Sequence, residues 1–280
     1  MFRIDLLVFA TVVTFDVRPA DTRLVTDTEW LDSRHSFAFG HHYEPDNTHF
    51  GLLMANNADT LAPGTGYDAH PHRDVEIVTW VIAGSLVHAD SDGNTGLIYP
   101  GLAQRMSAGS GIQHSERNDR YRLPTAADGG DGMIAADGTI GGDGDAYADL
   151  PPVRFVQMWI APSELGIAPS YQQRDINDLL AGGDLVTVAS GLPQHRDEAA
   201  IRLHQTDAGL SAARLPARGV IELPVAEFVH VYIVAGEVLV EDAGVLSAGD
   251  AARVTLSDGR RLTATGAAEV LLWQMRSSLT

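Results

Sequence analysis

The apolar residues of this chain occur in short segments that are rich in β-branched side chains and end at turn-forming residues. Such segments lie at 76–84, 154–161, 227–244 and 269–275, and Gly, Pro, Asp or Asn bounds most of them. Short runs with these boundaries are typical of strands, whereas helical periodicity is scarce and predicts one short helix, at 176–180. The sequence therefore predicts an all-β chain built from antiparallel sandwiches or barrels.

A segment rich in glycine and aspartate, 125–149, divides the chain into two parts. It holds seven Gly, six Asp and no basic residue, a composition typical of a flexible surface loop. A calcium-binding β-roll repeat is the alternative, but the spacing is irregular and there is a single copy, which favours the loop. Strands ending in I-A-G or V-A-G recur at 77–84 and 228–236. We therefore expect a duplicated barrel, at 14–124 and 150–280.

Composition narrows the classes of function. The chain has 37 acidic residues and 19 basic residues, all of them Arg, which gives a formal net charge of −18. A negative field repels phosphate backbones, so we expect no direct nucleic-acid binding. The absence of cysteine excludes disulfides, thiolate zinc sites, iron–sulfur clusters and cysteine nucleophiles. Any metal must therefore be held by carboxylates and by some of the 11 histidines.

The N-terminus carries one apolar run, Leu6 to Val13, which is too short to span a bilayer. Asp5 directly before this run, and the lack of a clear small-residue cleavage site, make it a poor signal peptide. We therefore interpret 1–13 as an extension ahead of a cytoplasmic protein without membrane association. We expect the protein to be a monomer.

Two short motifs carry the clearest chemical signal, His70-Pro71-His72 and His114-Ser115-Glu116. Residues two apart on a strand point to the same face, so each motif presents two potential metal ligands to one side. If the two strands lie side by side or face each other, three imidazoles and one carboxylate converge. This donor set suits a divalent transition metal such as iron, manganese, nickel, copper or zinc. Four protein ligands leave an octahedral ion one or two open positions.

The expected strand after the first motif has an apolar face with the same parity as His70 and His72. The residues of this face are Val78, Trp80 and Ile82. We expect them to line the barrel interior, so that the metal lies at one end of an apolar barrel. Glu76 shares this parity and is a rival fourth ligand, because spacing alone does not choose between Glu76 and Glu116.

Long stretches of the chain closely resemble the pirin family of bicupins. They are SRHSFAFGHHYEPDNTHFG (33–51), PGTGYDAHPHRDVEIVTWVIAGSLVHADSDGNTGLIYPG (63–101), QRMSAGSGIQHSERN (104–118), FVQMWI (155–160) and PSYQQRDI (169–176). The resemblance covers nearly the whole chain except the N-terminal extension and the segment 125–149, which looks like an insertion. It implies two cupin-type β-barrels in one chain. It also implies that the family's ligands fall on His70, His72, His114 and Glu116, and so favours Glu116 over Glu76.

The resemblance also implies an activity. The pirin family includes quercetin 2,3-dioxygenases, which open the heterocyclic ring of a flavonol with dioxygen and release carbon monoxide. This implies a small aromatic, flavonol-like substrate, O2 and a divalent metal cofactor, for which iron is the first candidate. Glu116 is then both a ligand and the base that takes the 3-hydroxyl proton. The alternative is a metal- and redox-dependent regulator that binds a protein partner without turnover, and the motif does not discriminate between the two.

The remaining histidines have less chemical significance. His230 stands alone on the expected strand 228–236, and a lone histidine on an apolar strand is typical of a hydrogen-bonded core residue. We therefore expect the second barrel to be free of metal. His41, His42 and His49 lie in a polar segment that we interpret as a solvated loop. His88 follows a turn and is expected to lie outside the barrel.

Overall fold

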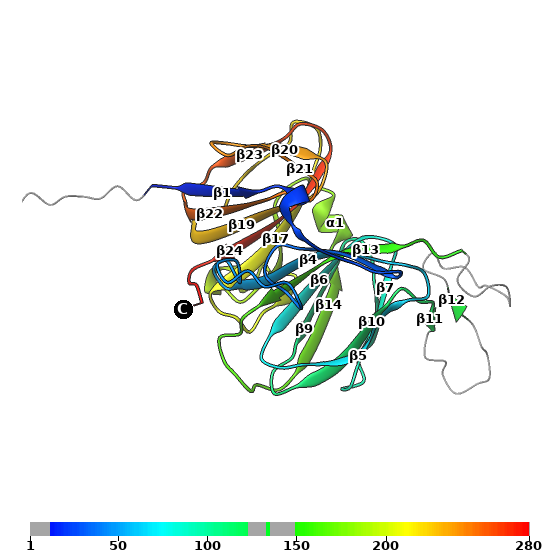
Figure 1. Ribbon diagram of the computed structural model, residues 1–280. Coiled ribbons are helices and arrows are strands. Elements are labelled where there is room, and N and C mark those ends of the chain that lie inside the picture. The colour runs from blue at the N-terminus through cyan, green and yellow to red at the C-terminus, as the bar shows by residue number, and fades with distance from the viewer. Residues whose placement is uncertain (1–11, 123–132, 135–148, 280) are drawn as a thin grey trace, which may run out of the picture.

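The computed structural model describes residues 12–122, 133–134 and 149–279, and it is built almost entirely of strands (Figure 1). The strands form two barrels, each made of one seven-stranded and one four-stranded sheet. The all-β class and the two cupin-like domains are confirmed. The expected extension 1–13 and the Gly/Asp-rich segment 125–149 lie almost wholly outside the described residues. No helix within the described ranges is long and apolar enough to cross a membrane.

The first barrel contains most of the N-terminal half of the chain. The strands of its larger sheet are β2 (Leu24–Asp27), β3 (Leu31–His35), β4 (Leu53–Leu61), β6 (Glu76–Ala83), β9 (Leu102–Ser107), β13 (Val153–Ile160) and β14 (Ser170–Asp175), in the order β14-β9-β6-β13-β4-β3-β2. Those of its smaller sheet are β5 (Gly66–His72), β7 (Leu86–Asp90), β8 (Thr95–Ile98) and β10 (Ile112–Arg117), in the order β5-β10-β7-β8. A short separate pair consists of β11 (Tyr121–Arg122) and β12 (Met133–Ile134).

The second barrel repeats this plan. The strands of its larger sheet are β1 (Thr14–Arg18), β15 (Val186–Ser190), β16 (Ile201–Arg202), β17 (Ala208–Leu215), β19 (Ala226–Ala235), β22 (Ala251–Ser257) and β24 (Ala268–Met275), in the order β1-β22-β19-β24-β17-β15-β16. Those of its smaller sheet are β18 (Val220–Glu222), β20 (Glu237–Val240), β21 (Gly244–Ser247) and β23 (Arg261–Ala264), in the order β18-β23-β20-β21. The helical elements are α1 (Asn177–Leu180), which confirms the expected short helix, and the 3₁₀ turns η1 (Ala20–Thr22) and η2 (Pro193–His195).

Three strands belong to the other barrel than the boundaries expected from the sequence would assign them to. β1 pairs with β22 of the second barrel, although it lies at the start of the segment 14–124. β13 and β14 follow the Gly/Asp-rich segment, yet β13 pairs with β4 and β6, and β14 pairs with β9. The segment 125–149 therefore does not separate the two sets of sheets. Strand partners are set by hydrogen bonding and packing over long sequence distances, which local composition does not reveal.

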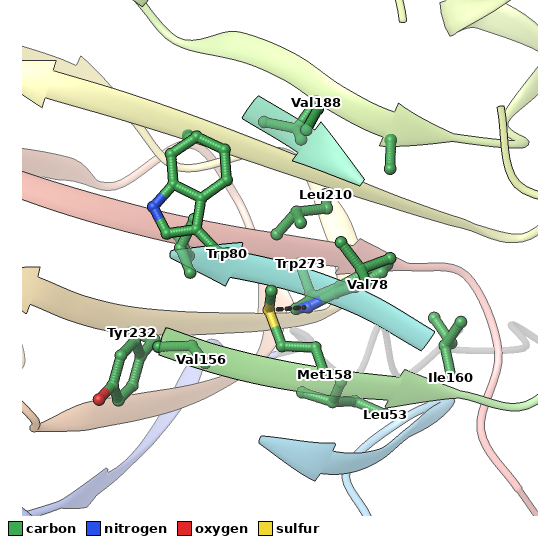
Figure 2. Close-up of a cluster of buried hydrophobic side chains, with 14 of the residues drawn as sticks. Leu53, Val78, Trp80, Val156, Met158, Ile160, Val188, Leu210, Tyr232 and Trp273 are labelled. Atoms are coloured by element: carbon green, nitrogen blue, oxygen red, sulfur yellow. Dashed lines mark hydrogen bonds between the residues drawn. The ribbon is translucent and has the colours of Figure 1, made fainter. Parts of the chain in front are cut away.

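A buried apolar cluster joins the two barrels (Figure 2). Val156 and Met158 of β13 and Trp80 of β6 meet Tyr232 and Trp273 of the second barrel in this cluster. The indole N–H of Trp273 approaches the Met158 sulfur at 3.1 Å. Each barrel therefore covers an apolar sheet face of the other, and the two share one core.

The apolar face of β6 packs against the second barrel, so its expected place inside the first barrel is wrong. Val78 and Trp80 belong to the inter-barrel cluster and Ile82 packs against it. The alternate face, with Thr79, points into the first barrel. Strand parity is not continuous from β5 to β6 because a turn intervenes, in which Asp74 has a left-handed φ of 50°. Counting residues by twos holds only within one uninterrupted strand.

His230 of β19 also lies between the barrels. It is fully buried, as expected, and its ring centroid lies 6.1 Å from that of Phe37. The expected hydrogen bond is not found, because neither ring nitrogen has a partner within the described part of the chain. Burial, followed by the charges of Arg253 and Arg23, lowers the pKa of His230 to about 3. The imidazole is therefore neutral at pH 7.

The shared core predicts that the two barrels unfold together. Met158 is fully buried, so Met158→Ala should lower the free energy of unfolding by about 2–5 kcal/mol while keeping a single transition. Leu239→Ala, at a residue 48% exposed on β20, is the control and should change it by less than about 0.5 kcal/mol. Urea unfolding followed by circular dichroism and tryptophan fluorescence measures both. Two separate transitions in the wild type would contradict the prediction.

The lowered pKa of His230 predicts a contribution to acid sensitivity. Its folded value is about 3 and its ordinary value is 6.5. Between these values the unfolded chain binds the proton more readily, so the free energy of unfolding falls as the pH drops below 6.5. His230→Phe takes up no proton and should make this fall smaller by about 3 kcal/mol at pH 4. Urea unfolding at pH 7, 5.5 and 4 compares the variant with the wild type and with the exposed control His41→Phe. Equal pH dependence in all three would refute the prediction.

Candidate metal centre

Three neighbouring strands of the smaller sheet carry the candidate ligands. β10 lies between β5 and β7, and its His114 pairs with His70 of β5 and with Asp90 of β7. Two residues further along β10, Glu116 pairs with His88 of β7. The pairing of β10 with β5 shifts register between His114 and Glu116, which marks a β-bulge. Strand pairing thus brings the two sequence motifs to one place.

His70, His72 and His114 form a compact group, here called the histidine triad. The ring centroids of His70 and His114 are 4.5 Å apart, and each lies 4.8 Å from that of His72. One nitrogen of each ring lies within 4.8 Å of a nitrogen in each of the other two. His114 is buried, whereas His70 and His72 are half-buried. The triad is therefore open to solvent or a ligand on the β5 side.

Several nitrogens of the triad have no hydrogen-bond partner. Nε2 of His72 and both ring nitrogens of His114 are buried without one among residues 12–122, 133–134 and 149–279. His70 differs, because its Nδ1 lies 2.7 Å from the backbone carbonyl oxygen of Asp68. Since a carbonyl only accepts, Nδ1 of neutral His70 carries the proton and Nε2 keeps its lone pair. Unpaired imidazole lone pairs that face one another are the donors that a divalent transition metal requires.

Burial keeps two of the three imidazoles uncharged. Together with neighbouring histidines, it lowers the pKa of His114 to about 3 and that of His72 to about 4. Burial is the larger cause, and the neighbouring histidines contribute because protonated rings at this distance would repel each other. A metal ion binds the neutral form of histidine. At pH 7, His72 and His114 are therefore already in the protonation state that coordination needs.

Glu116 lies beside His114 at the inner side of the triad. It is 1% exposed, and its Oε2 accepts a hydrogen bond of 2.5 Å from Nε2 of Gln157. Its Oε1 accepts a longer one, 3.4 Å, from the hydroxyl of Thr79. One ligand atom each of Glu116, His114 and His88 lies within 4.8 Å of the other two. The structure thus gives two groups of potential ligands that share His114.

His88 lies inside the barrel, and its expected position outside is wrong. It is fully buried, and its Nδ1 has no partner among the described residues. Its Nε2 lies 3.4 Å from Oδ2 of Asp90, and its ring stacks on that of Tyr171 at 4.8 Å. The parity of the strand was the available signal, because His88 is two residues after the buried Leu86.

Gln157 and Trp159 of β13 are further residues of the site that the sequence interpretation missed. The indole N–H of Trp159 donates to Oε1 of Gln157 at 3.0 Å, which leaves the amide group of Gln157 to hold Glu116. The Trp159 ring meets His72 edge-to-face at 4.8 Å and Phe39 at 5.1 Å. The alternation of side chains along β13 could have revealed them, because Gln157 and Trp159 lie two and four residues after the buried Phe155 and therefore point to the same face.

Glu76, the rival fourth ligand, is engaged elsewhere. It is 1% exposed, and its carboxylate accepts hydrogen bonds from the Ser107 hydroxyl at 2.7 Å and from the backbone N–H groups of His204 and Gln205 at 3.0 and 2.6 Å. His204 and Gln205 lie between β16 and β17 of the second barrel. Glu76 therefore ties the first barrel to the second.

The histidines of the polar loop differ from one another. His41 is exposed, as expected for a solvated loop. His42 is half-buried, and its Nε2 lies 3.1 Å from the Thr26 hydroxyl oxygen, which in turn lies 2.9 Å from Nε2 of His35. His49 is half-buried and contacts Thr48. None of the three belongs to the histidine triad.

Comparisons with known proteins agree with the resemblance of the sequence motifs. Residues 17–160 match the family model described as Pirin, and residues 187–275 match one described as the quercetinase C-terminal cupin domain. A Mycobacterium tuberculosis protein provisionally named a quercetin 2,3-dioxygenase is 48% identical over 266 residues, which cover 95% of this chain and 97% of that protein. A quercetin 2,3-dioxygenase of Escherichia coli is 34% identical over 189 residues, 68% of this chain and 67% of that protein.

Solved structures show the same fold. The crystal structure of YhhW from Escherichia coli is similar with a TM-score of 0.76 and 28% identity, covering 95% of this chain and all of that chain. A crystal structure of the same bacterial pirin in complex with nickel(II) gives a TM-score of 0.75 at the same identity and the same shares of both chains.

The contacts of Glu76 predict a structural role that can be measured. In Glu76→Gln one carboxylate oxygen becomes an NH2 group that faces hydrogen-bond donors, so the free energy of unfolding should fall by about 1–3 kcal/mol. Glu222→Gln, at an exposed position on β18, is the matched control and should change it by less than about 0.5 kcal/mol. Urea unfolding at pH 7 measures both variants. A Glu76→Gln variant as stable as the wild type would contradict the assignment.

Proposed function

This chain belongs to the pirin family, and we propose that it is a metal-dependent oxygenase of the quercetin 2,3-dioxygenase type. The observation that carries the proposal is the histidine triad, whose buried nitrogens lack hydrogen-bond partners beside a carboxylate that is firmly held. The names of the similar proteins from Mycobacterium tuberculosis and Escherichia coli support the substrate class.

His70, His72, His114 and Glu116 are the proposed metal ligands. The clustering of three imidazoles supports the first three, and the proximity of Glu116 to His114 supports the fourth. This set of nitrogen and oxygen donors suits a divalent transition metal. Iron is our first candidate, and the nickel(II) complex of YhhW makes nickel the second ion to test.

Residues around the triad suit a flat aromatic substrate. Trp159 and Phe39 form an aromatic wall next to His72, with ring centroids 5.1 Å apart. Both are partly exposed, so part of each ring is free to contact a ligand. Aromatic rings pack against such walls edge-to-face or offset-stacked. We therefore assign Phe39 and Trp159 to substrate positioning.

Glu116 is the proposed base for the 3-hydroxyl group of the flavonol. Gln157 holds its Oε2 at 2.5 Å, whereas the Thr79 contact to Oε1 is long, so Oε1 is the oxygen that takes the proton. A bound divalent ion would act as a Lewis acid toward the substrate oxygens. Loss of the proton makes the ring electron-rich enough to react with O2, with both oxygen atoms entering the product and carbon monoxide leaving.

Oxygen consumption with quercetin tests the proposal directly. Protein reconstituted separately with iron, nickel, manganese, copper and zinc should turn over with at least one of them, with stoichiometric carbon monoxide. His72→Ala should lose turnover and most of the bound metal, measured by atomic emission. Metal bound by the wild type with no turnover for any ion would contradict the activity and favour the partner-binding alternative.

The proposed role of Glu116 can be tested with Glu76, a second buried glutamate of the first barrel, as the matched control. Glu116→Gln should retain some metal but lower turnover by about 10²-fold or more, because the amide does not accept the proton. Glu76→Gln should stay within a few-fold of the wild type at temperatures where both are folded. Full activity in Glu116→Gln, or an equal loss in the two variants, would remove Glu116 as the base.

A further inference from the structure

A cavity of about 380 Å³ lies between the two barrels, away from the proposed metal ligands. Ala58, Thr60 and Ile82 line it from the outer face of the first barrel's larger sheet. Tyr232 and Val234 of β19 line it from the second barrel. Figure 2 shows Tyr232 at the edge of the inter-barrel cluster, with its hydroxyl directed away from the other labelled side chains. The cavity is therefore bounded by both barrels and is partly apolar.

Arg23 contributes a buried positive charge to the cavity. It is 9% exposed, and its Nη1 donates to the Tyr232 hydroxyl at 3.2 Å. Its Nη2 donates to the backbone carbonyls of Asn56, at 2.8 Å, and Arg34, while its Nε has no partner among the described residues. All these acceptors are neutral, and Arg23 makes no ion pair in the described part of the chain. The charge of Asp59 acts on Arg23 without a direct contact, so an anion bound directly to the guanidinium group would stabilise this buried cation further.

Arg154 adds a second unpaired guanidinium group. It lies on β13, lines the cavity, is exposed, and forms no hydrogen bond or ion pair through its side chain within the described ranges. Arg34, the third arginine of the lining, is instead neutralised by Asp32 through two contacts of 2.9 and 3.0 Å. The Arg154 side chain thus remains free to contact an anion, and the buried Arg23 adds positive charge to the same lining.

Within the described part of the chain, the acidic residues of the lining form no direct ion pair with Arg23 or Arg154. Asp59 accepts hydrogen bonds from the Ser33 hydroxyl at 2.5 Å and from the Tyr67 hydroxyl at 3.0 Å. Burial raises the pKa of Asp59 to about 6, so this carboxyl is still mostly ionised at pH 7. Asp21 is exposed and is the remaining carboxylate of the lining once Asp32 is paired with Arg34. The lining thus carries three Arg and three Asp, so an anion would bind through direct contacts with Arg154 and Arg23 and not through a net positive charge.

We propose that this cavity binds a small aromatic carboxylate. Its ring would contact Ile82, Tyr232 and Val234, and its carboxylate would lie toward Arg23 and Arg154. Guanidinium groups match the planar geometry of a carboxylate, and the volume accommodates a single aromatic ring with its acid group. This site is independent of the oxygenase activity, because none of the proposed metal ligands lines the cavity.

Calorimetric titration with benzoate tests the proposal, with the uncharged benzamide as the matched ligand. The full-length protein should bind benzoate at least about tenfold more tightly than benzamide, because the amide lacks the charge-assisted hydrogen bonds. Arg154→Gln should weaken benzoate binding about tenfold or more. Arg174→Gln, an exposed arginine on β14 outside the cavity, is the control and should bind within twofold of the wild type. No binding at millimolar benzoate, or equal affinity in the two variants, overturns the proposal.

A carboxylate also binds metal ions, so the titration needs a second comparison. Benzoate should bind with the same affinity to metal-loaded protein, to chelator-treated protein and to His72→Ala. Binding that disappears with the metal or in His72→Ala, but persists in Arg154→Gln, would locate benzoate at the histidine triad. That result also overturns the proposal, whatever the outcome of the quercetin assay.

Discussion

The pairing of β10 with β5 and β7 is the interaction on which the candidate centre depends. It sets His114 opposite His70 and places Glu116 opposite His88. Because side chains alternate along a strand, a register shift of one residue would turn His114 and Glu116 to the other face of the sheet. The donor groups are therefore close together only in this register. The backbone hydrogen bonds between the strands are what bring the two sequence motifs into one site.

The same sheet strands that hold the carboxylate also hold the two barrels together. In β13, Gln157 faces inward and donates to Glu116, while Met158 faces outward into the inter-barrel cluster. In β6, Thr79 likewise faces inward and contacts Glu116, while Val78 faces outward into the inter-barrel cluster. The second barrel has an apolar interior, yet it buries the outer face of the strands that position Glu116. A barrel with no proposed ligand thus supports the site by packing.

The sequence predicted the class of fold and the proximity of the three candidate histidines better than it predicted their surroundings. Short-range alternation was sufficient to find the two motifs, and long-range pairing brings their three histidines together. Alternation failed where a turn interrupts the count, as between β5 and β6. For His88 the alternation with Leu86 was present in the sequence, but the interpretation gave more weight to the preceding turn. Glu76 and Glu116 were equivalent by spacing alone. Their contacts differ because Glu76 meets the backbone N–H groups of Gln205 and His204, which are far away in the sequence.

Buried groups without partners suggest a cation at the histidine triad and an anion in the cavity between the barrels. His72 and His114 are neutral and present lone pairs, which suits a cation, whereas Arg23 is a buried cation and suits an anion. The net charge of −18 attracts cations toward the protein and opposes the approach of anions. An anion between the barrels must therefore gain its affinity from short-range contacts. A shared apolar and arginine-lined cavity supplies these, since hydrogen bonds to guanidinium groups strengthen where water is excluded.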